Sequence, residues 1–287
     1  MKKILVFCLL SLLALVNGYA QSQTEKISKT GSFQNPQASH VLSVVNIQGF
    51  VKIEGYNGDK VLLEAEKTIA AKNQTDLAKG VQEMQLQLIE SGDSLYVYLE
   101  APFIFRKKSR GRSMSINMED VDYDYKFDVT LKVPFTTILD VSTVNNGDVT
   151  INNTSGPIKV RNVNGGIYLN NIAGAANAST VNGPVEVIYA QNPSVDSKFK
   201  TINGKVKVHY APKLNATVSF KSMNGQFYTD LTDLEMLPVK VTRNTTNNGS
   251  GTVYKVDKNQ NYKVGQGGIS LTFETLNGNI YLQKKKQ

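Results

Sequence analysis

The sequence predicts an all-β protein, a β-solenoid (β-helix-like) built from Asn-Gly repeats of 18–21 residues. Six copies of one phrase carry this prediction: an apolar residue, Asn-Gly, a variable residue, and two apolar residues separated by one position. The glycines of the first five copies recur at spacings of 18, 18, 21 and 21 residues, and the sixth follows 53 residues later. A period of about 20 residues is typical of solenoids, in which one repeat buries its apolar face only by stacking on the next. The copies, the first of which has one extra Asn, span Val144–Ile151, Val163–Leu169, Val181–Val187, Ile202–Val208, Met223–Tyr228 and Leu276–Leu282.

Each Asn-Gly pair lies between two predicted strands. The segments before it, such as Phe199-Lys200-Thr201 and Phe273-Glu274-Thr275, alternate apolar and polar residues. Such alternation, with β-branched and aromatic residues, indicates a strand that buries one face. We therefore expect a strand, an Asn-Gly corner, a second strand and a return turn in every repeat. Asn and Gly suit this corner because both tolerate a positive φ angle at low cost.

Two arrangements of these strands agree with the repeats. An Asn-Gly pair between alternating strands also signals a two-residue hairpin, so consecutive hairpins would build an antiparallel stack or sandwich. The regular spacing favours a coil with parallel strands, in which the Asn side chains form a ladder. In such a coil Val185, Val206 and Phe227 lie above one another, about 4.8 Å apart. Parallel stacking also places two outward pairs side by side, Glu186 with Lys207 and Tyr228 with Tyr281.

Residues 1–20 are expected to be a cleavable secretory signal peptide. A basic start precedes an almost unbroken apolar run from Ile4 to Val16, and small residues lead to a cleavage site after Ala20. This run of 13 residues is too short to span a bilayer at ~1.5 Å per residue. The only cysteine, Cys8, lies inside the signal. We therefore expect a mature chain without disulfides or a cysteine-linked lipid.

The remaining chain is expected to consist of a β-rich N-terminal cap, residues 21–138, and a repeat region, residues 139–287. A cap is required because an open solenoid end exposes unpaired backbone and apolar side chains. The cap region contains a degenerate copy of the repeat at Gln48–Ile53. The repeat region contains a long insertion at 229–268. Longer strands are expected at Lys60–Lys67, Leu95–Leu99 and Tyr125–Val133, and one short helix is expected within Asp76–Leu88.

Basic residues exceed acidic ones. The net charge of the whole chain is +8, and without Lys2 and Lys3 there remain 30 basic and 24 acidic residues. The surplus is concentrated in a loop at 106–112 and in the tail Lys284–Lys286. A basic cluster can bind nucleic acid, anionic lipid or acidic glycan, although a solvated hairpin tip and a frayed tail are the simpler explanation. Because export argues against nucleic acid, the loop is a candidate for another anionic partner through Arg106, Lys107, Lys108, Arg110 and Arg112.

No catalytic or metal-binding signature is visible, so we expect no cofactor, no metal and no enzymatic activity. The two histidines, His40 and His209, are far apart, and His209 is expected to point outward. The alternating acids of 120–124 resemble the start of a calcium loop, but the Gly and the downstream Glu that complete such a loop are missing. A polysaccharide hydrolase needs two carboxyl groups across a sugar bond. The acids of the repeats occupy unrelated repeat positions: Asp140, Asp148, Glu186 and Asp196.

Three outward tyrosines, Tyr168, Tyr228 and Tyr281, are weak candidates for ligand binding. Their rings could stack on sugars. They could equally be surface residues, since strands favour tyrosine in any case.

The chain resembles a known bacterial family at Val133–Leu231 and again at Gly267–Gln283. The residues that carry the resemblance are the reiterated Thr/Ser-apolar-Asn-Gly phrases after a strand that ends in Val133-Pro134. They are similar to the "putative adhesin" β-strand-repeat family of the DUF4097 type. The resemblance implies a β-helical fold and an exported or surface role, and it supplies no catalytic residues. The basic loop at 106–112 departs from the family pattern.

These observations lead to one functional hypothesis and two alternatives. The hypothesis is an exported, non-catalytic, adhesin-like scaffold that binds glycan or protein at the bacterial envelope, in the periplasm, on the outer surface or after secretion. The first alternative is an envelope-structural or stress-sensing module that binds another protein through its basic loop. The second is a polysaccharide-cleaving enzyme.

Overall fold

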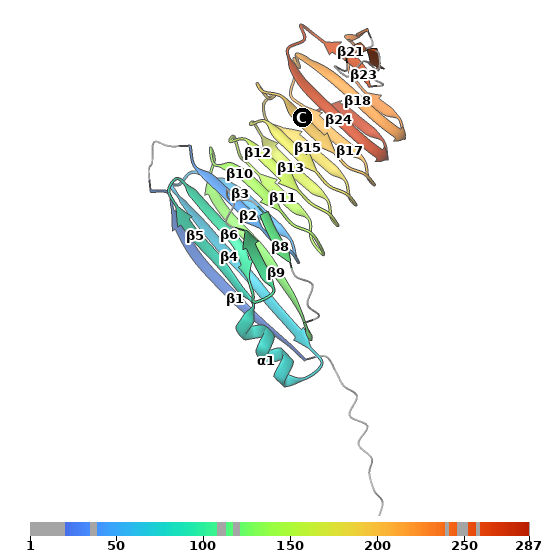
Figure 1. Cartoon of the computed structure of the whole chain (residues 1–287). Coiled ribbons are helices and arrows are strands. Elements are labelled where there is room, and N and C mark those ends of the chain that lie inside the picture. Colours follow the sequence, from blue (N-terminus) through green and yellow to red (C-terminus); the bar gives the residue numbers. More distant parts are fainter. Residues whose placement is uncertain are drawn as a thin grey trace, which may run out of the picture.

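The computed structural model describes residues 21–34, 39–107, 113–116, 121–238, 241–245, 252–256 and 259–286. Within these residues the protein is all-β, apart from one helix, α1 (Gln74–Glu83). Two long sheets lie face to face and share one elongated core (Figure 1). The predicted signal peptide, residues 1–20, lies outside the described residues.

Sheet A has ten strands, in the order β1-β4-β9-β3-β11-β13-β15-β17-β25-β19. From β9 to β19 every neighbouring pair is parallel, whereas β4 pairs antiparallel with both β1 and β9. The strands are β1 (Gln21–Ser32), β4 (Lys60–Ala71), β9 (Tyr123–Pro134), β3 (Val51–Tyr56), β11 (Val149–Asn152), β13 (Ile167–Ile172), β15 (Val185–Tyr189), β17 (Val206–Tyr210), β25 (Ile280–Lys284) and β19 (Phe227–Thr229).

Sheet B has eleven strands, in the order β20-β23-β18-β24-β16-β14-β12-β10-β2-β6-β5. From β18 to β6 the neighbours are parallel, and antiparallel strands close both ends. The strands are β20 (Leu234–Met236), β23 (Gln260–Val264), β18 (Ala216–Asn224), β24 (Ile269–Asn277), β16 (Ser197–Lys200), β14 (Ala176–Ser179), β12 (Ile158–Arg161), β10 (Ile138–Ser142), β2 (Val41–Val45), β6 (Ser94–Glu100) and β5 (Gln85–Ser91). Two further hairpins pair β7 (Ile104–Lys107) with β8 (Ser113–Ile116), and β21 (Val241–Thr245) with β22 (Thr252–Val256).

The repeats form a stack of rungs, each made of one strand of sheet B, a corner, and one strand of sheet A. The parallel arrangement is therefore the one that the structure adopts, and the hairpin alternative is wrong for the repeats. In stack order, rung 1 is β2 and β3, rung 2 is β10 and β11, rung 3 is β12 and β13, rung 4 is β14 and β15, rung 5 is β16 and β17, rung 6 is β24 and β25, and rung 7 is β18 and β19.

The last two rungs do not follow chain order, and here the sequence-based prediction is wrong. Val185 and Val206 are direct neighbours, as expected, but Phe227 is not the next residue in this column. Ile280 pairs with Val206 on one side and with Phe227 on the other. The chain thus builds rung 7 before rung 6, and its C-terminal repeat lies between two earlier ones. Apolar residues still stack on apolar residues, because every repeat has them at the same inward positions.

The core is a set of columns that run along the stack. One column in sheet A consists of small and medium aliphatic side chains, and each of them is fully buried. Opposite it, Phe273 of rung 6 lies between Phe199 and Phe220, with ring centroids 5.4 Å and 5.1 Å apart. Burying such side chains stabilises the fold by about 1.5–3 kcal/mol each. The aliphatic column is Val51, Val149, Ile167, Val185, Val206 and Ile280.

The N-terminal end of the stack is covered by β6 and β9, which pair in parallel with rung 1 and antiparallel with β5 and β4, and by α1. Asn73 caps α1 by accepting a hydrogen bond from the Asp76 N–H, at 3.0 Å. The helix is held to β4 by the buried Lys67, whose Nζ donates to the Val81 carbonyl at 2.7 Å. At the far end, β23 pairs antiparallel with β18, and β20 pairs antiparallel with β23. The end strands thus use the backbone groups of rungs 1 and 7 that would otherwise be unpaired in sheet B.

The stack begins earlier in the chain than the repeat spacing suggests. Val51–Tyr56 pairs in parallel with β11, and Val41–Val45 pairs in parallel with β10. Residues 41–56 therefore form rung 1, although they lie within the predicted cap, 21–138. The division at residue 138 stays a prediction about domains.

Candidate functional site

The Asn-Gly corners form a continuous outer ladder of side-chain amides. The Nδ2 of each corner asparagine donates to the Oδ1 of the asparagine one rung closer to the N-terminal cap, at 2.7–2.8 Å. Each of these bonds satisfies one donor and one acceptor of an exposed amide, and the whole ladder fixes the register of the rungs. The ladder runs Asn145, Asn164, Asn182, Asn203, Asn277 and Asn224.

A second ladder lies inside the same corner, two positions before the asparagine. The Thr201 hydroxyl donates to the Gly183 carbonyl of the neighbouring rung at 2.8 Å, and Thr180 and Thr275 make the same bond at 2.8 and 3.0 Å. A side-chain donor is needed here because the glycine carbonyl would otherwise lack one, and in rung 3 the Asn162 Nδ2 supplies it to the Gly147 carbonyl at 3.0 Å. This contact explains the Thr/Ser at the start of the repeated phrase.

The corner glycines are required by close approach rather than by φ, which corrects the sequence-based explanation. A Cβ on Gly204 would overlap the Gly183 carbonyl of the adjacent rung, and a Cβ on Gly165 would overlap the Gly147 carbonyl. None of the corner asparagines of the ladder has a positive φ, and among the corner glycines of the described rungs only Gly49 and Gly183 do. The glycine of the repeated Asn-Gly phrase is therefore needed because adjacent rungs lie too close for a side chain.

The three predicted tyrosines lie on the outer face of sheet A, in one row that runs along the stack. Tyr168 is next to Glu186, Glu186 is next to Lys207, and Lys207 is next to Tyr281. Tyr228 follows Tyr281 at the end of the row. The structure thus confirms the expected neighbours Glu186–Lys207 and Tyr228–Tyr281. Three rung steps separate Tyr168 from Tyr281, which is about 14 Å.

An ion pair lies between the two groups of tyrosines. The Nζ of Lys205, a corner residue, lies 2.9 Å from the Glu186 Oε1. This hydrogen bond to Glu186 raises the pKa of Lys205, and Tyr168 and Tyr281 add to the effect. Burial, with Asp148 and Glu186 nearby, raises the pKa of the Tyr168 phenol. A tyrosine hydroxyl is neutral at neutral pH in any case and can donate a hydrogen bond. We name Tyr168, Glu186, Lys207, Tyr281 and Tyr228, with Lys205 beside Glu186, the tyrosine row.

The two adjacent tyrosines differ in what their rings can offer. The rings of Tyr228 and Tyr281 are stacked, with centroids 5.0 Å apart and planes 11° apart. Tyr281 has Lys207 on its other side, so its ring is enclosed between two neighbours. Tyr228 is on the terminal strand of sheet A and is 43% exposed. Within the described strands no further rung covers its outer face, so Tyr228 is the ring best placed for a ligand.

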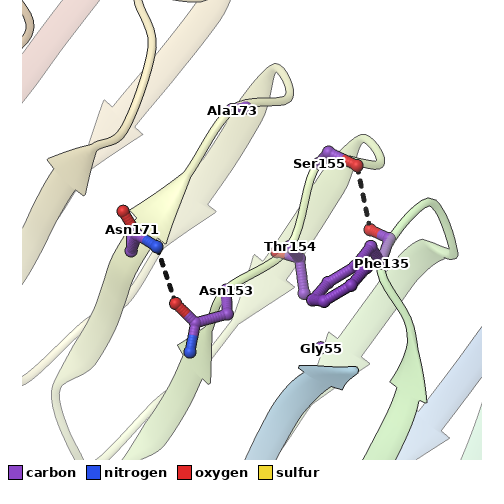
Figure 2. A pocket seen from close by; sticks show the side chains of 7 residues that line it. All are labelled: Gly55, Phe135, Asn153, Thr154, Ser155, Asn171 and Ala173. Carbon is purple, nitrogen blue, oxygen red and sulfur yellow. Dashed lines mark hydrogen bonds between the residues drawn. The ribbon is translucent and has the colours of Figure 1, made fainter. Parts of the chain in front are cut away.

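A shallow hollow lies where β3, the turn between β9 and β10, and the segments after β11 and around the end of β13 meet (Figure 2). Phe135 forms its apolar wall and is 43% exposed. The polar groups around it largely bond one another: the Asn171 Nδ2 donates to the Asn153 Oδ1 at 2.7 Å, and the Ser155 Oγ donates to the Phe135 carbonyl at 3.2 Å. The Oγ1 of Thr154, which also lines the hollow, is buried without a hydrogen-bond partner. The hollow therefore offers a ligand few directed contacts.

The other predicted site residues are not brought to the tyrosine row by anything that the structure describes. Lys108, Arg110 and Arg112 lie outside the described residues, and the side chains of Arg106 and Lys107 in β7 are not described either. Within the described residues no group of three or more His, Cys, Asp or Glu side chains could hold a metal ion. In the same residues no helix is long and apolar enough to cross a membrane.

Sequence reasoning missed Lys205 as part of the site. It lies in the variable position after Asn-Gly, where the other repeats have unrelated residues. Only the parallel register shows that this position is near the outward residue of the preceding rung. The sequence could have indicated this ion pair, because a lysine follows Asn-Gly in the repeat directly after the one that contains Glu186.

One family model matches part of the chain. Residues 128–227 match the model of a family described as Toastrack DUF4097. No curated protein matches the chain.

Three crystal structures are similar to this chain at low sequence identity. A "putative cell adhesion protein" from Clostridium sporogenes ATCC 15579 is 11% identical with a TM-score of 0.41, over 92% of this chain and 100% of that one. A "putative lipid binding protein" from Parabacteroides distasonis ATCC 8503 is 13% identical with a TM-score of 0.34, over 94% and 98% of the two chains. A "putative adhesin" from the same organism is 10% identical with a TM-score of 0.26, over 92% and 98%.

The matched segment contains most of β9, all of rungs 2 to 5, and β18 of rung 7 with its corner. The strands of rung 6, β24 and β25, come later in the chain and are not matched. The family resemblance stated from the Asn-Gly phrases is therefore confirmed where the model matches, at residues 128–227, and the second stretch, Gly267–Gln283, lies outside the match.

Proposed function

We propose that this protein is an exported, non-catalytic scaffold of the bacterial envelope that binds an extended glycan along the tyrosine row. The observation that carries the proposal is the placement of three tyrosines and an ion pair in one continuous row on a rigid outer face. Aromatic rings offer flat apolar surfaces, and their hydroxyl groups remain able to hydrogen-bond. Glu186 and Lys205 supply an acceptor and a donor between the rings. The expected binding mode is additive contact along the row.

The roles of the repeat carboxylates support a non-catalytic reading. Asp140 is paired with Arg161 at 2.9 Å, and Glu186 is paired with Lys205. The other two carboxylates accept backbone N–H bonds, Asp148 at 2.6 Å and Asp196 at 2.7 Å. Each of these acids thus has a structural partner in a different place. A hydrolytic pair would need two carboxyl groups that face one substrate bond.

The direct test is glycan binding by the purified protein, first on an array and then by calorimetry with the best ligand. We expect Tyr228→Ala to weaken binding about fivefold, because an exposed stacked ring contributes about 1 kcal/mol. Tyr228→Phe should retain most of the affinity, since the ring remains. Tyr96→Ala, on the outer face of sheet B, is the matched control and should have no effect.

Three outcomes would contradict the proposal. Equal losses for Tyr228→Ala and Tyr96→Ala would place the ligand elsewhere. Capture of an envelope protein, with no glycan bound, would favour the protein-interaction alternative. Release of reducing ends from any polysaccharide by the purified protein would show that it is an enzyme.

A further inference from the structure

The outer face of sheet B carries a second charged row, on the side of the stack opposite the tyrosine row. Its outward residues in rungs 3 to 7 form two columns. In one column the neighbours run from Lys159 to Ser219, and in the other they run from Arg161 to Lys221. The first column is Lys159, Asn177, Lys198, Thr272 and Ser219, and the second is Arg161, Ser179, Lys200, Glu274 and Lys221.

The cations occur on alternate rungs. Rung 3 carries Lys159 and Arg161, rung 5 carries Lys198 and Lys200, and rung 7 carries Lys221. Rungs 4 and 6, which lie between them, carry neutral side chains and a single acid. Parallel rungs are about 4.8 Å apart, so cationic positions recur every ~10 Å over a length of ~19 Å. Alternation limits the repulsion that like charges on adjacent strands would cause.

The acids near this row neutralise only part of its charge. The Asp140 carboxylate pairs with Arg161, and Glu274 pairs with Lys198 at 2.8 Å and with Lys200 at 3.8 Å. Two carboxylates thus face five cationic side chains. The paired cations also remain about half exposed: 46% for Arg161, 49% for Lys198 and 48% for Lys200. The row is positively charged and accessible.

The shape and composition of the row limit what can bind it. Residues two positions apart on a strand are about 6.6 Å apart, so the row is only two side chains wide. A narrow line of charge fits one extended polymer chain better than the plane of a membrane. None of its side chains is aromatic, whereas proteins that bind single-stranded nucleic acid stack bases on aromatic rings. Its amide and hydroxyl groups, from Asn177, Ser179, Thr272 and Ser219, suit sugar hydroxyls.

We infer that this row, Lys159 to Lys221, is a second binding site, and that it takes a linear acidic polysaccharide with carboxylate groups. The polymer lies along the stack, with carboxylates at the cations of rungs 3, 5 and 7 and neutral sugar hydroxyls at rungs 4 and 6. This site is independent of the tyrosine row, which lies on the other sheet. It thus extends the proposed function from one ligand face to two.

The test compares two triple variants of equal charge by calorimetry, with a polyuronate oligomer of defined length as the probe. Lys159→Gln, Lys200→Gln and Lys221→Gln together should weaken binding at least about tenfold and reduce its salt dependence, because fewer cations contact the polymer. The control triple is Lys26→Gln, Lys60→Gln and Lys132→Gln, exposed positions near the cap end of sheet A. It should bind like the unmodified protein. Circular dichroism establishes that both variants are folded.

The proposal is overturned if the oligomer does not bind, or if both triple variants lose the same affinity. It is also overturned if a neutral glucan oligomer competes equally well. Tighter binding of single-stranded DNA or of anionic phospholipid vesicles, lost in the first triple variant, would assign the row to another class of partner. The Lys159, Lys200 and Lys221 triple variant should keep its affinity for the array-selected glycan, whose binding Tyr228→Ala weakens, so failure of this inference is distinguishable from failure of the tyrosine-row proposal.

Discussion

The rung stack and the N-terminal cap are both β-structure, but different kinds of contact stabilise them. In the stack, the same contact recurs at every rung: asparagine to asparagine, and hydroxyl to glycine carbonyl. In the cap, each contact occurs once, as where the Tyr123 hydroxyl donates to Glu83 at 2.7 Å, or where Lys67 anchors α1. Recurrent contacts constrain the residue type at every repeat, whereas single contacts constrain only one pair. The stack is therefore visible in the sequence as a repeat, and the cap is not.

The clearest test of the stack is whether rung 6 or rung 7 lies next to rung 5. We expect a Lys207→Cys/Tyr281→Cys pair to form a disulfide, because these residues are direct neighbours on parallel strands. Lys207→Cys/Tyr228→Cys should not form one, since a whole rung separates the two positions. Non-reducing electrophoresis of the oxidised protein distinguishes them. Cross-linking of the second pair alone would show that rung 7 follows rung 5 directly.

Glycine substitution should have the largest effect on stability. We expect Gly204→Ala to lower the free energy of unfolding by about 3 kcal/mol or more, because the new Cβ forces two rungs apart. The control is Gly92→Ala in the cap, where φ is +57° but nothing lies within 4 Å of the added atom. There the cost should be only about 1–2 kcal/mol, from the backbone conformation alone. Urea unfolding followed by circular dichroism measures both, and a larger loss at Gly92 would restore φ as the explanation for the corner glycines.

Loss of the inner hydroxyl contacts should have the second-largest effect on the free energy of unfolding. Thr201→Val keeps the shape of the side chain but leaves the Gly183 carbonyl without its donor, so we expect a loss of about 1–3 kcal/mol. Thr201→Ser retains the hydroxyl and should cost less than half as much. The same urea experiment compares them. If valine were tolerated as well as serine, the hydroxyl would have no role in stacking.

The outer asparagine ladder should show the smallest effect, since it is exposed. Asn203→Ala removes two side-chain hydrogen bonds, one to Asn182 and one from Asn277. We expect a loss of about 1–2 kcal/mol. Asn224→Ala, at the end of the ladder, removes one such bond and should cost about half of that. Equal losses at the two positions would mean that the ladder does not act through its bonds along the stack.

Much of the stack could be predicted from the sequence because the repeat encodes it locally. The alternation of apolar and polar residues around Phe199 and Phe273 predicted strands, and the regular spacing of the Asn-Gly pairs predicted parallel rungs. The helix expected within Asp76–Leu88 is present as Gln74–Glu83. Of the candidate site, the three tyrosines were found because they occupy the same outward position. Their grouping with Lys205 was not predictable, since it depends on contacts between rungs.

The sequence by itself determined the rung, its corner and its inward residues, because each follows from short-range alternation and from glycines that only close stacking requires. Tertiary structure alone decided where each rung lies. All repeats present nearly the same edge, so the sequence of a rung does not specify its neighbour. The long segment between Tyr228 and Ile269 lets the chain form rung 7 and return to fill rung 6. In the order adopted, Phe273 lies between Phe199 and Phe220, an arrangement that the linear sequence does not contain.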